Sequence, residues 1–224
     1  MAEHTKEAQY QVCLDIREAQ GLTPLGLMSN QVWLDDPKRL TFVLARYKFV
    51  AKMFSGMAQV LEVGCADAFA TRIVQQAVGH VTAVDFDAVF VKDACERMDP
   101  RWPFTCFTHD MLAGAVPGAF DGAYALDVLE HIAPADEAQF LGHMVASLHQ
   151  HGALIIGMPS LESQVYASAP SKAGHVNCKT APELKALLAG FFHNVFIFSM
   201  NDEVVHTGYH ALAHYLFALC TTKK

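Results

Sequence analysis

Short apolar runs alternate with helical patterns along most of the chain beyond its first 56 residues. The runs that predict strands are 59–64, 81–85, 104–108, 122–127 and 153–158, and the segments with helical spacing are 69–78, 88–98, 137–150 and 181–190. Alternation of strands and helices at this spacing is typical of βαβ units. The pattern therefore predicts an α/β protein with a doubly wound parallel sheet and helices on both faces.

The pattern changes near the end of the chain. Residues 194–200 and 210–220 form two strand-like apolar runs, and a polar loop without a helical pattern separates them. Two strands that are joined without a crossover helix run in opposite directions. We therefore expect the last strand to be antiparallel to the strand before it.

The first 56 residues have a different pattern. Residues 7–21 predict a short helix that Gly21 closes, and residues 22–33 predict a loop because they include Pro, Gly, Ser and Asn. Residues 35–56 predict a long helix with Asp36 as its cap and Pro37 in its first turn. We expect residues 1–56 to form an N-terminal helical segment that packs on the core, and residues 57–224 to form a single globular domain.

Composition and charge limit the function classes. Of the 224 residues 52% are hydrophobic and 17% are charged, and the formal net charge is −7. The 16 Lys and Arg residues form no long run, which argues against a nucleic-acid-binding protein. The six cysteines form no CxxC pair, which is typical of a reducing compartment. We find neither a signal-peptide pattern nor an apolar run long enough to span a membrane, so a cytoplasmic protein is expected.

The turn after the first predicted strand, in the stretch VLEVGCADAFATRIV, is the first candidate ligand site. Ligands of such sheets bind at the carboxyl ends of the strands. A dinucleotide fingerprint needs glycine at positions 66 and 69, where this chain has Ala66 and Phe69. The turn keeps only Gly64, so a nicotinamide enzyme is disfavoured, and one glycine alone is a weak signal.

Acidic residues at four successive strands strengthen this candidate. Glu62 lies inside the first strand, where a carboxylate is costly unless it serves a donor network. Asp85 ends the second strand and could accept hydrogen bonds from ribose hydroxyls. Asp110 follows the third strand, and Asp127 ends the fourth. A rim of acids suits a neutral or cationic adenosyl ligand better than a pyrophosphate.

The segments VLEVGCADAF, AVDFD, HDM and LDVLEHI, in this order and spacing, resemble the motif series of class I S-adenosylmethionine-dependent methyltransferases. DVLEHI is especially similar to the ubiquinone/menaquinone-biosynthesis type. The resemblance covers roughly residues 38–200. It implies a Rossmann-like sheet of seven strands in the order 3-2-1-4-5-7-6, with strand 7 antiparallel.

The resemblance also implies a methyl-donor site. The glycine turn lies under the methionine part of S-adenosylmethionine, Asp85 binds the ribose, and Asp110 with Met111 lies at the adenine. The donor-binding candidates are Glu62, Gly64, Cys65, Ala66, Asp67, Asp85, Phe86, Asp110, Met111, Asp127, Val128 and Arg46. The family usually has glycine at positions 66 and 68. Because two alanines add only methyl groups, we expect a tighter turn that still binds the donor.

Three polar loops are expected to converge over the methyl donor, because the strands before them are parallel. The catalytic candidates in these loops are His175, His206, His131 and Asp202, and the substrate-binding candidates are Tyr166, Asn177, Asn201 and Glu203. A histidine with a pKa near ~6.5 can remove a proton from a hydroxyl or an amine. No metal is expected, because the candidate histidines His131, His175 and His206 have no HxxxH or HxH spacing among themselves.

We therefore expect an S-adenosylmethionine-dependent methyltransferase that methylates an oxygen of a small molecule or glycan precursor, with a homodimer as one possible assembly. Three alternatives stay open: an N-methyltransferase, a non-catalytic adenosyl-binding protein and a nicotinamide-type oxidoreductase.

Overall fold

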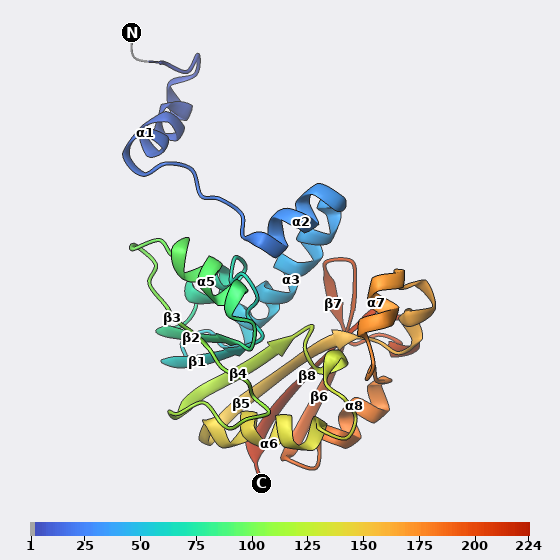
Figure 1. Ribbon diagram of the computed structural model, residues 1–224. Helices are drawn as coiled ribbons and strands as arrows, with labels where there is room; N and C mark the ends of the chain where they lie inside the picture. Colours follow the sequence, from blue (N-terminus) through green and yellow to red (C-terminus); the bar gives the residue numbers. More distant parts are fainter. Residues whose placement is uncertain (1–2) are drawn as a thin grey trace.

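The computed structural model describes residues 3–224 and contains one eight-stranded sheet. The strands are β1 (Gln59–Val63), β2 (His80–Asp85), β3 (Thr105–Thr108), β4 (Phe120–Leu126), β5 (Leu148–Pro159), β6 (Phe192–Asn201), β7 (Val204–His206) and β8 (Tyr215–Lys223). Their order is β3-β2-β1-β4-β5-β8-β6-β7 (Figure 1). The predicted α/β class and seven-strand order are confirmed, with β8 as the antiparallel strand. The short β7 is an addition at the edge.

Eight α-helices accompany the sheet over the described residues. They are α1 (Gln11–Gln20), α2 (Leu27–Asp35), α3 (Pro37–Met53), α4 (Thr71–Gln75), α5 (Ala88–Glu96), α6 (Glu137–Ser147), α7 (Ala169–Gly174) and α8 (Ala181–Leu188). Asp36 caps α3 as expected, since its side chain accepts from the Lys38 N–H and Pro37 occupies the first turn. Among residues 3–224, none of the helices has the length and apolar character that a membrane span requires.

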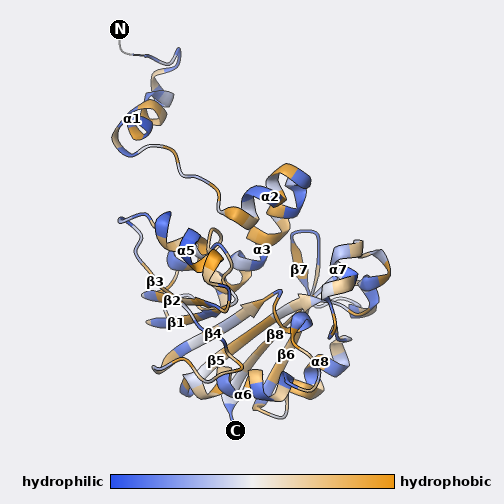
Figure 2. Cartoon of the chain, in the orientation of Figure 1, coloured by the Kyte–Doolittle hydropathy of each residue, from blue (hydrophilic) through white to orange (hydrophobic). Residues whose placement is uncertain are grey.

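Alternate residues of each central strand enter two separate cores. In β4, Ala123 and Ala125 belong to one core, whereas Tyr124 and Leu126 belong to the other. The helices α6 and α8 cover the first face, and α3, α4 and α5 cover the second. In Figure 2 the hydrophobic colour extends along β5 and β8, whereas α6 and α8 carry both kinds of residue. Burial on both faces is the reason that the strands appear in the sequence as nearly continuous apolar runs.

The N-terminal segment contains a helix that the sequence pattern did not predict. Residues 22–33 were expected to form a loop, but α2 begins at Leu27. The acceptors for the first N–H groups of α2 lie in other parts of the chain. The helix α3 packs deeply, and both Val50 and Phe54, the residue that follows its last turn, are fully buried. In contrast, α1 has no buried residue, and Figure 1 shows it lying away from the sheet.

Candidate active site

The turn after β1 has a left-handed backbone at three of its residues. Gly64, Ala66 and Ala68 have φ angles of 76°, 45° and 52°. At Gly64 a Cβ atom would clash with Cγ2 of Val128, which follows β4, so only glycine fits at this position. The alanines were expected to add methyl groups and tighten the turn. The structure shows that their main consequence is conformational, because L-residues adopt this region at a cost.

We predict that Ala66→Gly stabilises the protein. Left-handed backbone costs an alanine about 1–2 kcal/mol, and the extra freedom of glycine in the unfolded chain offsets about 0.5–1 kcal/mol of that gain. The free energy of unfolding in urea should therefore rise by up to about 1 kcal/mol. Ala70→Gly is the matched control: Ala70 has an ordinary φ of −77°, so this variant should lose stability. Equal losses in both variants would contradict the left-handed assignment.

Asp85, the last residue of β2, fixes the shape of this turn. One carboxylate oxygen accepts the Ala66 N–H at 2.8 Å, and the other accepts the Asp87 N–H at 2.9 Å. The side chain is buried. Each carboxylate oxygen can accept more than one hydrogen bond, so lone pairs stay available for a ligand hydroxyl. Asp85 therefore presents a pre-positioned acceptor beside the glycine turn.

The predicted adenine residues lie at the next strand end, because β2 and β3 pair in parallel and Asp85 is opposite Thr108. Asp110 is exposed, and its Oδ1 accepts the Leu112 N–H at 2.8 Å, while Oδ2 has no hydrogen-bond partner among residues 3–224. Met111 is buried beneath it, and Phe86 is 76% exposed. An exposed ring and a free carboxylate oxygen at this edge can bind a flat base that carries an amino group.

Glu62 is the buried carboxylate of β1, and the structure explains what it serves. Tyr47 of α3 donates to one oxygen at 2.8 Å, and Thr71 of α4 donates to the other at 2.6 Å. Burial raises the pKa of the Glu62 carboxyl, and the hydrogen bonds from the two hydroxyl groups lower it. Burial is the larger effect, so the pKa is about 7. Glu62 therefore joins both helices to the strand beneath the turn.

This raised pKa predicts a pH-dependent stability. The unfolded chain releases the Glu62 proton near pH 4.5 and the folded chain only near pH 7, so stability is lost as the pH rises between these values. We expect a loss of about 2–3 kcal/mol between about pH 5 and about pH 8. Glu62→Gln stays neutral and removes this loss, so the difference between variant and parent in urea unfolding should grow with pH. Parallel pH profiles for the two proteins would contradict the prediction.

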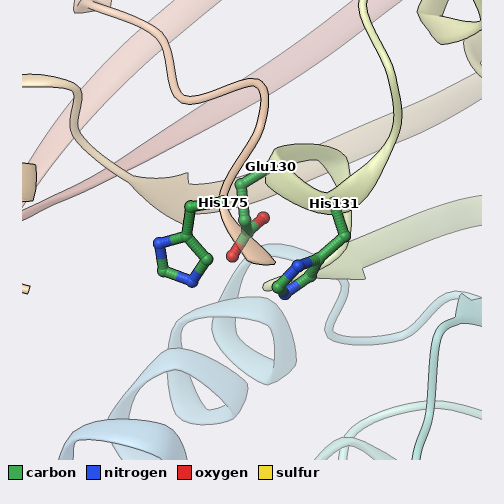
Figure 3. A group of neighbouring side chains, drawn as sticks. All are labelled: Glu130, His131 and His175. Carbon is green, nitrogen blue, oxygen red and sulfur yellow. The ribbon is translucent and has the colours of Figure 1, made fainter. Parts of the chain in front are cut away.

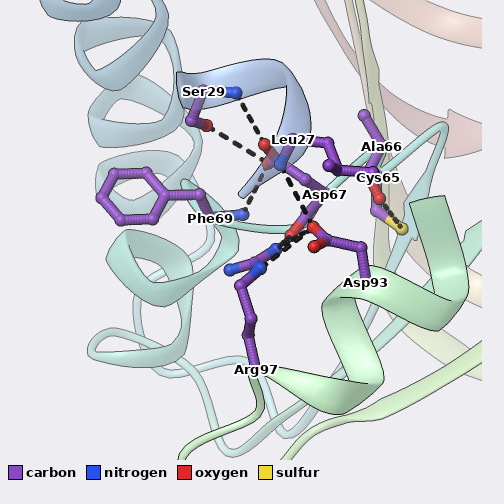
Figure 4. A network of polar contacts seen from close by, with 8 residues as sticks. All are labelled: Leu27, Ser29, Cys65, Ala66, Asp67, Phe69, Asp93 and Arg97. Atoms are coloured by element: carbon purple, nitrogen blue, oxygen red, sulfur yellow. Dashed lines mark hydrogen bonds and ion pairs between the residues drawn. The ribbon is translucent and has the colours of Figure 1, made fainter. Parts of the chain in front are cut away.

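Asp67 connects the turn to α2 (Figure 4). Its carboxylate accepts the Ser29 N–H at 2.7 Å and the Ser29 hydroxyl at 3.2 Å. The Leu27 N–H donates to Asp93, and Arg97 pairs with Asp93 and donates to the Asp67 carbonyl. The first N–H groups of α2 thus find acceptors on the turn and on α5. Asp67 was predicted to bind the donor, and here its carboxylate holds the helix beside the site.

Arg46 and Asp127 form an ion pair at the carboxyl end of β4. Arg46 Nη1 lies 2.8 Å and 2.6 Å from the two Asp127 oxygens, and its guanidinium stacks over the Tyr215 ring. Asp127 has a positive φ of 57°. Arg46 Nε is buried and has no acceptor among the described residues. An unpartnered guanidinium N–H suits an anionic ligand group, such as the carboxylate of a methionine moiety.

The histidines of two loops meet next to this ion pair (Figure 3). One side-chain donor atom each from Glu130, His131 and His175 lies within 4.8 Å of the other two. Burial, followed by the charge of Asp127, raises the pKa of Glu130 well above its ordinary value. Partial burial and the neighbouring His131 lower the pKa of His175. The structure thus brings two predicted catalytic histidines together and adds Glu130, which was not among the predicted site residues.

The other predicted catalytic residues lie in the β6–β7 hairpin. His206 accepts the Gly208 N–H at one ring nitrogen, and the other lies 2.9 Å from Asn201 Oδ1. Asp202 has a φ of 50° in the turn, and Glu203 accepts from the Thr41 hydroxyl of α3. Because both nitrogens of His206 are engaged inside the hairpin, His175 is the better placed of the two as a base.

The two substrate-binding candidates in the loop after β5 have different surroundings. Tyr166 is 90% exposed. Asn177 is buried, and its amide donates to Glu137 of α6 at 2.9 Å and accepts from Lys179 at 2.7 Å. Asn177 therefore anchors the loop to α6, whereas Tyr166 is free to contact a substrate.

A cavity of about 380 Å³ lies on the outer side of the turn. Its walls include Asp67, Phe69, Arg72 and Trp102, with the Arg72 guanidinium over the Trp102 ring at 3.7 Å. None of the strand-end acids Asp85, Asp110 and Asp127 lines it. Of the predicted donor-binding residues, only Asp67 lines this cavity.

Comparison with protein families gives one match. Residues 60–152 match the model of a family described as a methyltransferase domain. This range includes the glycine turn and every strand-end acid discussed above. No curated protein sequence matches the chain.

Solved structures with the same fold include three methyltransferases. N-methyltransferase NodS from Bradyrhizobium japonicum WM9, in complex with S-adenosylhomocysteine, has 21% identity and a TM-score of 0.64, over 84% of this chain and 90% of that chain. A TehB-like S-adenosylmethionine-dependent methyltransferase from Corynebacterium glutamicum has 15% identity and a TM-score of 0.61, over 96% of each chain. The methyltransferase domain of bacterial CtHen1-C has 13% identity and a TM-score of 0.67, over 82% of this chain and 100% of that chain.

Proposed function

We propose that this chain, which has the fold and the matched domain of the S-adenosylmethionine-dependent class I methyltransferases, methylates an oxygen of a small molecule or glycan precursor. The resemblance read from the sequence is confirmed at the level of the class. One observation supports the reaction most directly. Gly64 contacts Val128, and two residues further along, Glu130 begins the cluster with His131 and His175. The turn for the donor and the side chains for the acceptor are therefore adjacent.

The chain's own residues fit the donor. Asp85 offers acceptors to the ribose, and Phe86 with Asp110 offers an apolar face and an acceptor to the adenine. Arg46, which pairs with Asp127 at the carboxyl end of β4, offers a guanidinium charge near the methionine carboxylate. S-adenosylmethionine supplies an electrophilic methyl group on a sulfonium, and the protein holds the acceptor atom about 3–3.5 Å from it.

The acceptor lies at the Glu130, His131 and His175 cluster in this proposal. A neutral histidine nitrogen can accept the proton of a hydroxyl as oxygen attacks the methyl carbon. A neutral amine needs less help from a base, so the histidines favour an oxygen acceptor. NodS is an N-methyltransferase by its description, so methylation of nitrogen is the second candidate. The formal net charge of −7 argues against a nucleic-acid substrate.

We also propose a cytoplasmic location, because the six cysteines are all free in the described part of the chain. A homodimer is the assembly that we propose to test, by light scattering of the purified protein.

Transfer of labelled methyl groups tests the function. The protein is incubated with methyl-labelled S-adenosylmethionine and pooled small hydroxylated and amino compounds, and labelled products are identified by mass spectrometry. We expect a product methylated on oxygen. A product methylated on nitrogen would establish the second candidate. Donor binding without a methylated product from any pool would favour a non-catalytic adenosyl-binding protein.

A further inference from the structure

We propose that Glu130, His131 and His175 form a binding site for one divalent transition-metal cation. Two imidazoles and one carboxylate are a ligand set that suits Zn²⁺, Fe²⁺, Co²⁺ or Mn²⁺ better than the all-oxygen sites preferred by Mg²⁺ and Ca²⁺. The metal site itself is independent of the function proposed above. Its use in catalysis, described below, depends on that function.

The geometry of the three side chains is close to a coordination site. Their donor atoms lie within 4.8 Å of one another, and Figure 3 shows the three side chains converging from two loops. Ligand atoms at about 2.0–2.2 Å from a tetrahedral metal are about 3.4 Å apart, so a small contraction completes the site. No metal was predicted from the sequence, because His131 and His175 are far apart in the chain and do not have the spacing of a metal-binding motif.

Hydrogen bonds already hold both histidines in the form that binds metals. His131 Nδ1 lies 2.9 Å from the Gly174 carbonyl, which can only accept, so Nδ1 carries the proton and Nε2 has a free lone pair. His175 Nδ1 lies 2.8 Å from Gln164 Oε1. The Gln164 amide nitrogen donates to the Ser160 carbonyl, which fixes the orientation of the amide. Such outer partners are the usual companions of metal-binding histidines.

Backbone contacts also hold the two loops together at this point. The Glu130 carbonyl accepts the N–H groups of Val176 and Asn177, at 2.8 Å and 3.0 Å. With the His131 bond to Gly174, three hydrogen bonds therefore join the two ligand-bearing segments. The ligands are thus positioned before any cation binds, which lowers the entropic cost of forming the site.

The Glu130 side chain is the second, independent sign of a ligand. It is fully buried, and neither carboxylate oxygen has a hydrogen-bond partner among the described residues. Such a group is costly unless something compensates for it. Arg46 does not form a hydrogen bond with the Glu130 carboxylate, because its guanidinium pairs with Asp127. A divalent cation between Glu130 and the two histidines would supply the missing partner.

A cation with three protein ligands keeps open positions for exchangeable ligands. With the cation bound, His131 and His175 would act as ligands, and neither would act as the base. The acceptor hydroxyl would occupy one open position, and the metal would lower its pKa so that its proton leaves to water. The oxygen then forms a bond with the methyl carbon while the carbon–sulfur bond breaks, and S-adenosylhomocysteine leaves as a neutral thioether. Charge and atoms balance without any further reactant.

Titration of the metal-free protein with Co²⁺ tests the site, with calorimetry for stoichiometry and visible absorption for the ligand field. We expect one equivalent to bind. Glu130→Gln and His175→Ala should each weaken binding by more than about 100-fold, and Gln164→Leu, which removes only an outer partner, by about 10–100-fold. His151→Ala is the matched control, because His151 is exposed at the amino end of β5, and it should bind as the parent does.

Absence of saturable binding at one equivalent would overturn the proposal, and so would unchanged affinity in Glu130→Gln and His175→Ala. If Glu130→Gln does not fold, His175→Ala, with its partly exposed side chain, still decides the question. Metal binding at the cluster without methyl transfer would retain the site and remove the proposed function. Methyl transfer that persists without bound metal would retain the proposed function and remove the metal's role in catalysis.

Discussion

Asp85→Ala is expected to lower the affinity for S-adenosylmethionine by about 100-fold or more. The carboxylate offers acceptors to the ribose, and a hydrogen bond to a charged group contributes about 1.5–3 kcal/mol, or about 10–100-fold in affinity. The same carboxylate holds the Ala66 N–H, so the variant also loosens the turn under the donor. The two effects act in the same direction. Donor affinity is measured by calorimetric titration.

Asp121→Asn is the matched control for this prediction. Asp121 also accepts two backbone N–H groups, those of Ala58 and Gln59, but at the amino end of β1. Its loss should lower stability without lowering donor affinity. Circular dichroism of Asp85→Ala verifies that the variant is folded. A folded Asp85→Ala that binds the donor as tightly as the parent would remove Asp85 from the site.

His175→Ala is expected to lower turnover by about 100-fold or more while donor affinity stays close to that of the parent. A positioned acid–base group contributes about 10²–10⁴ to the rate. A histidine that contacts the acceptor stabilises the transition state and does not contact the bound donor. Its removal therefore lowers the rate constant of methyl transfer without weakening donor binding. This split between turnover and affinity distinguishes a role at the acceptor from a structural role.

His206→Ala, measured in parallel, separates the two histidines that the sequence left as alternatives. Its ring nitrogens are engaged with Gly208 and Asn201, so its removal should affect turnover much less than the removal of His175. A large loss of turnover in His206→Ala together with a small one in His175→Ala would move the acceptor site to the β6–β7 hairpin.

The order of the strands could be predicted because each buried strand leaves a local apolar run, and the acids at their ends follow directly in the sequence. The helix α2 could not be predicted in this way. Its first turn has no side-chain cap of its own, and its N–H groups at Leu27 and Ser29 find Asp93 and Asp67, which lie in other elements. A helix that depends on acceptors from elsewhere in the chain leaves little local signal.

Some residues of the candidate site could be identified from the sequence, whereas the contacts between its loops could not. Asp85 and Asp110 follow their strands at motif spacing, so the sequence shows them. The association of Glu130 with His175 depends on hydrogen bonds between two loops, and no spacing predicts it. The role of Glu62 also depends on tertiary partners, since Tyr47 and Thr71 come from two different helices. Local motifs therefore show the strand-end acids but not the contacts between the two loops.

Calorimetric titration of the parent protein with S-adenosylmethionine, S-adenosylhomocysteine and NADH tests the central claim most directly. A site with acids at the ends of β1 to β4 and only one glycine in its first turn should bind the adenosyl donor and its product at one equivalent and should not bind NADH. The calorimeter reports stoichiometry and affinity without knowledge of the acceptor. Binding of NADH, or no binding of either adenosyl compound by the folded protein, would contradict the account.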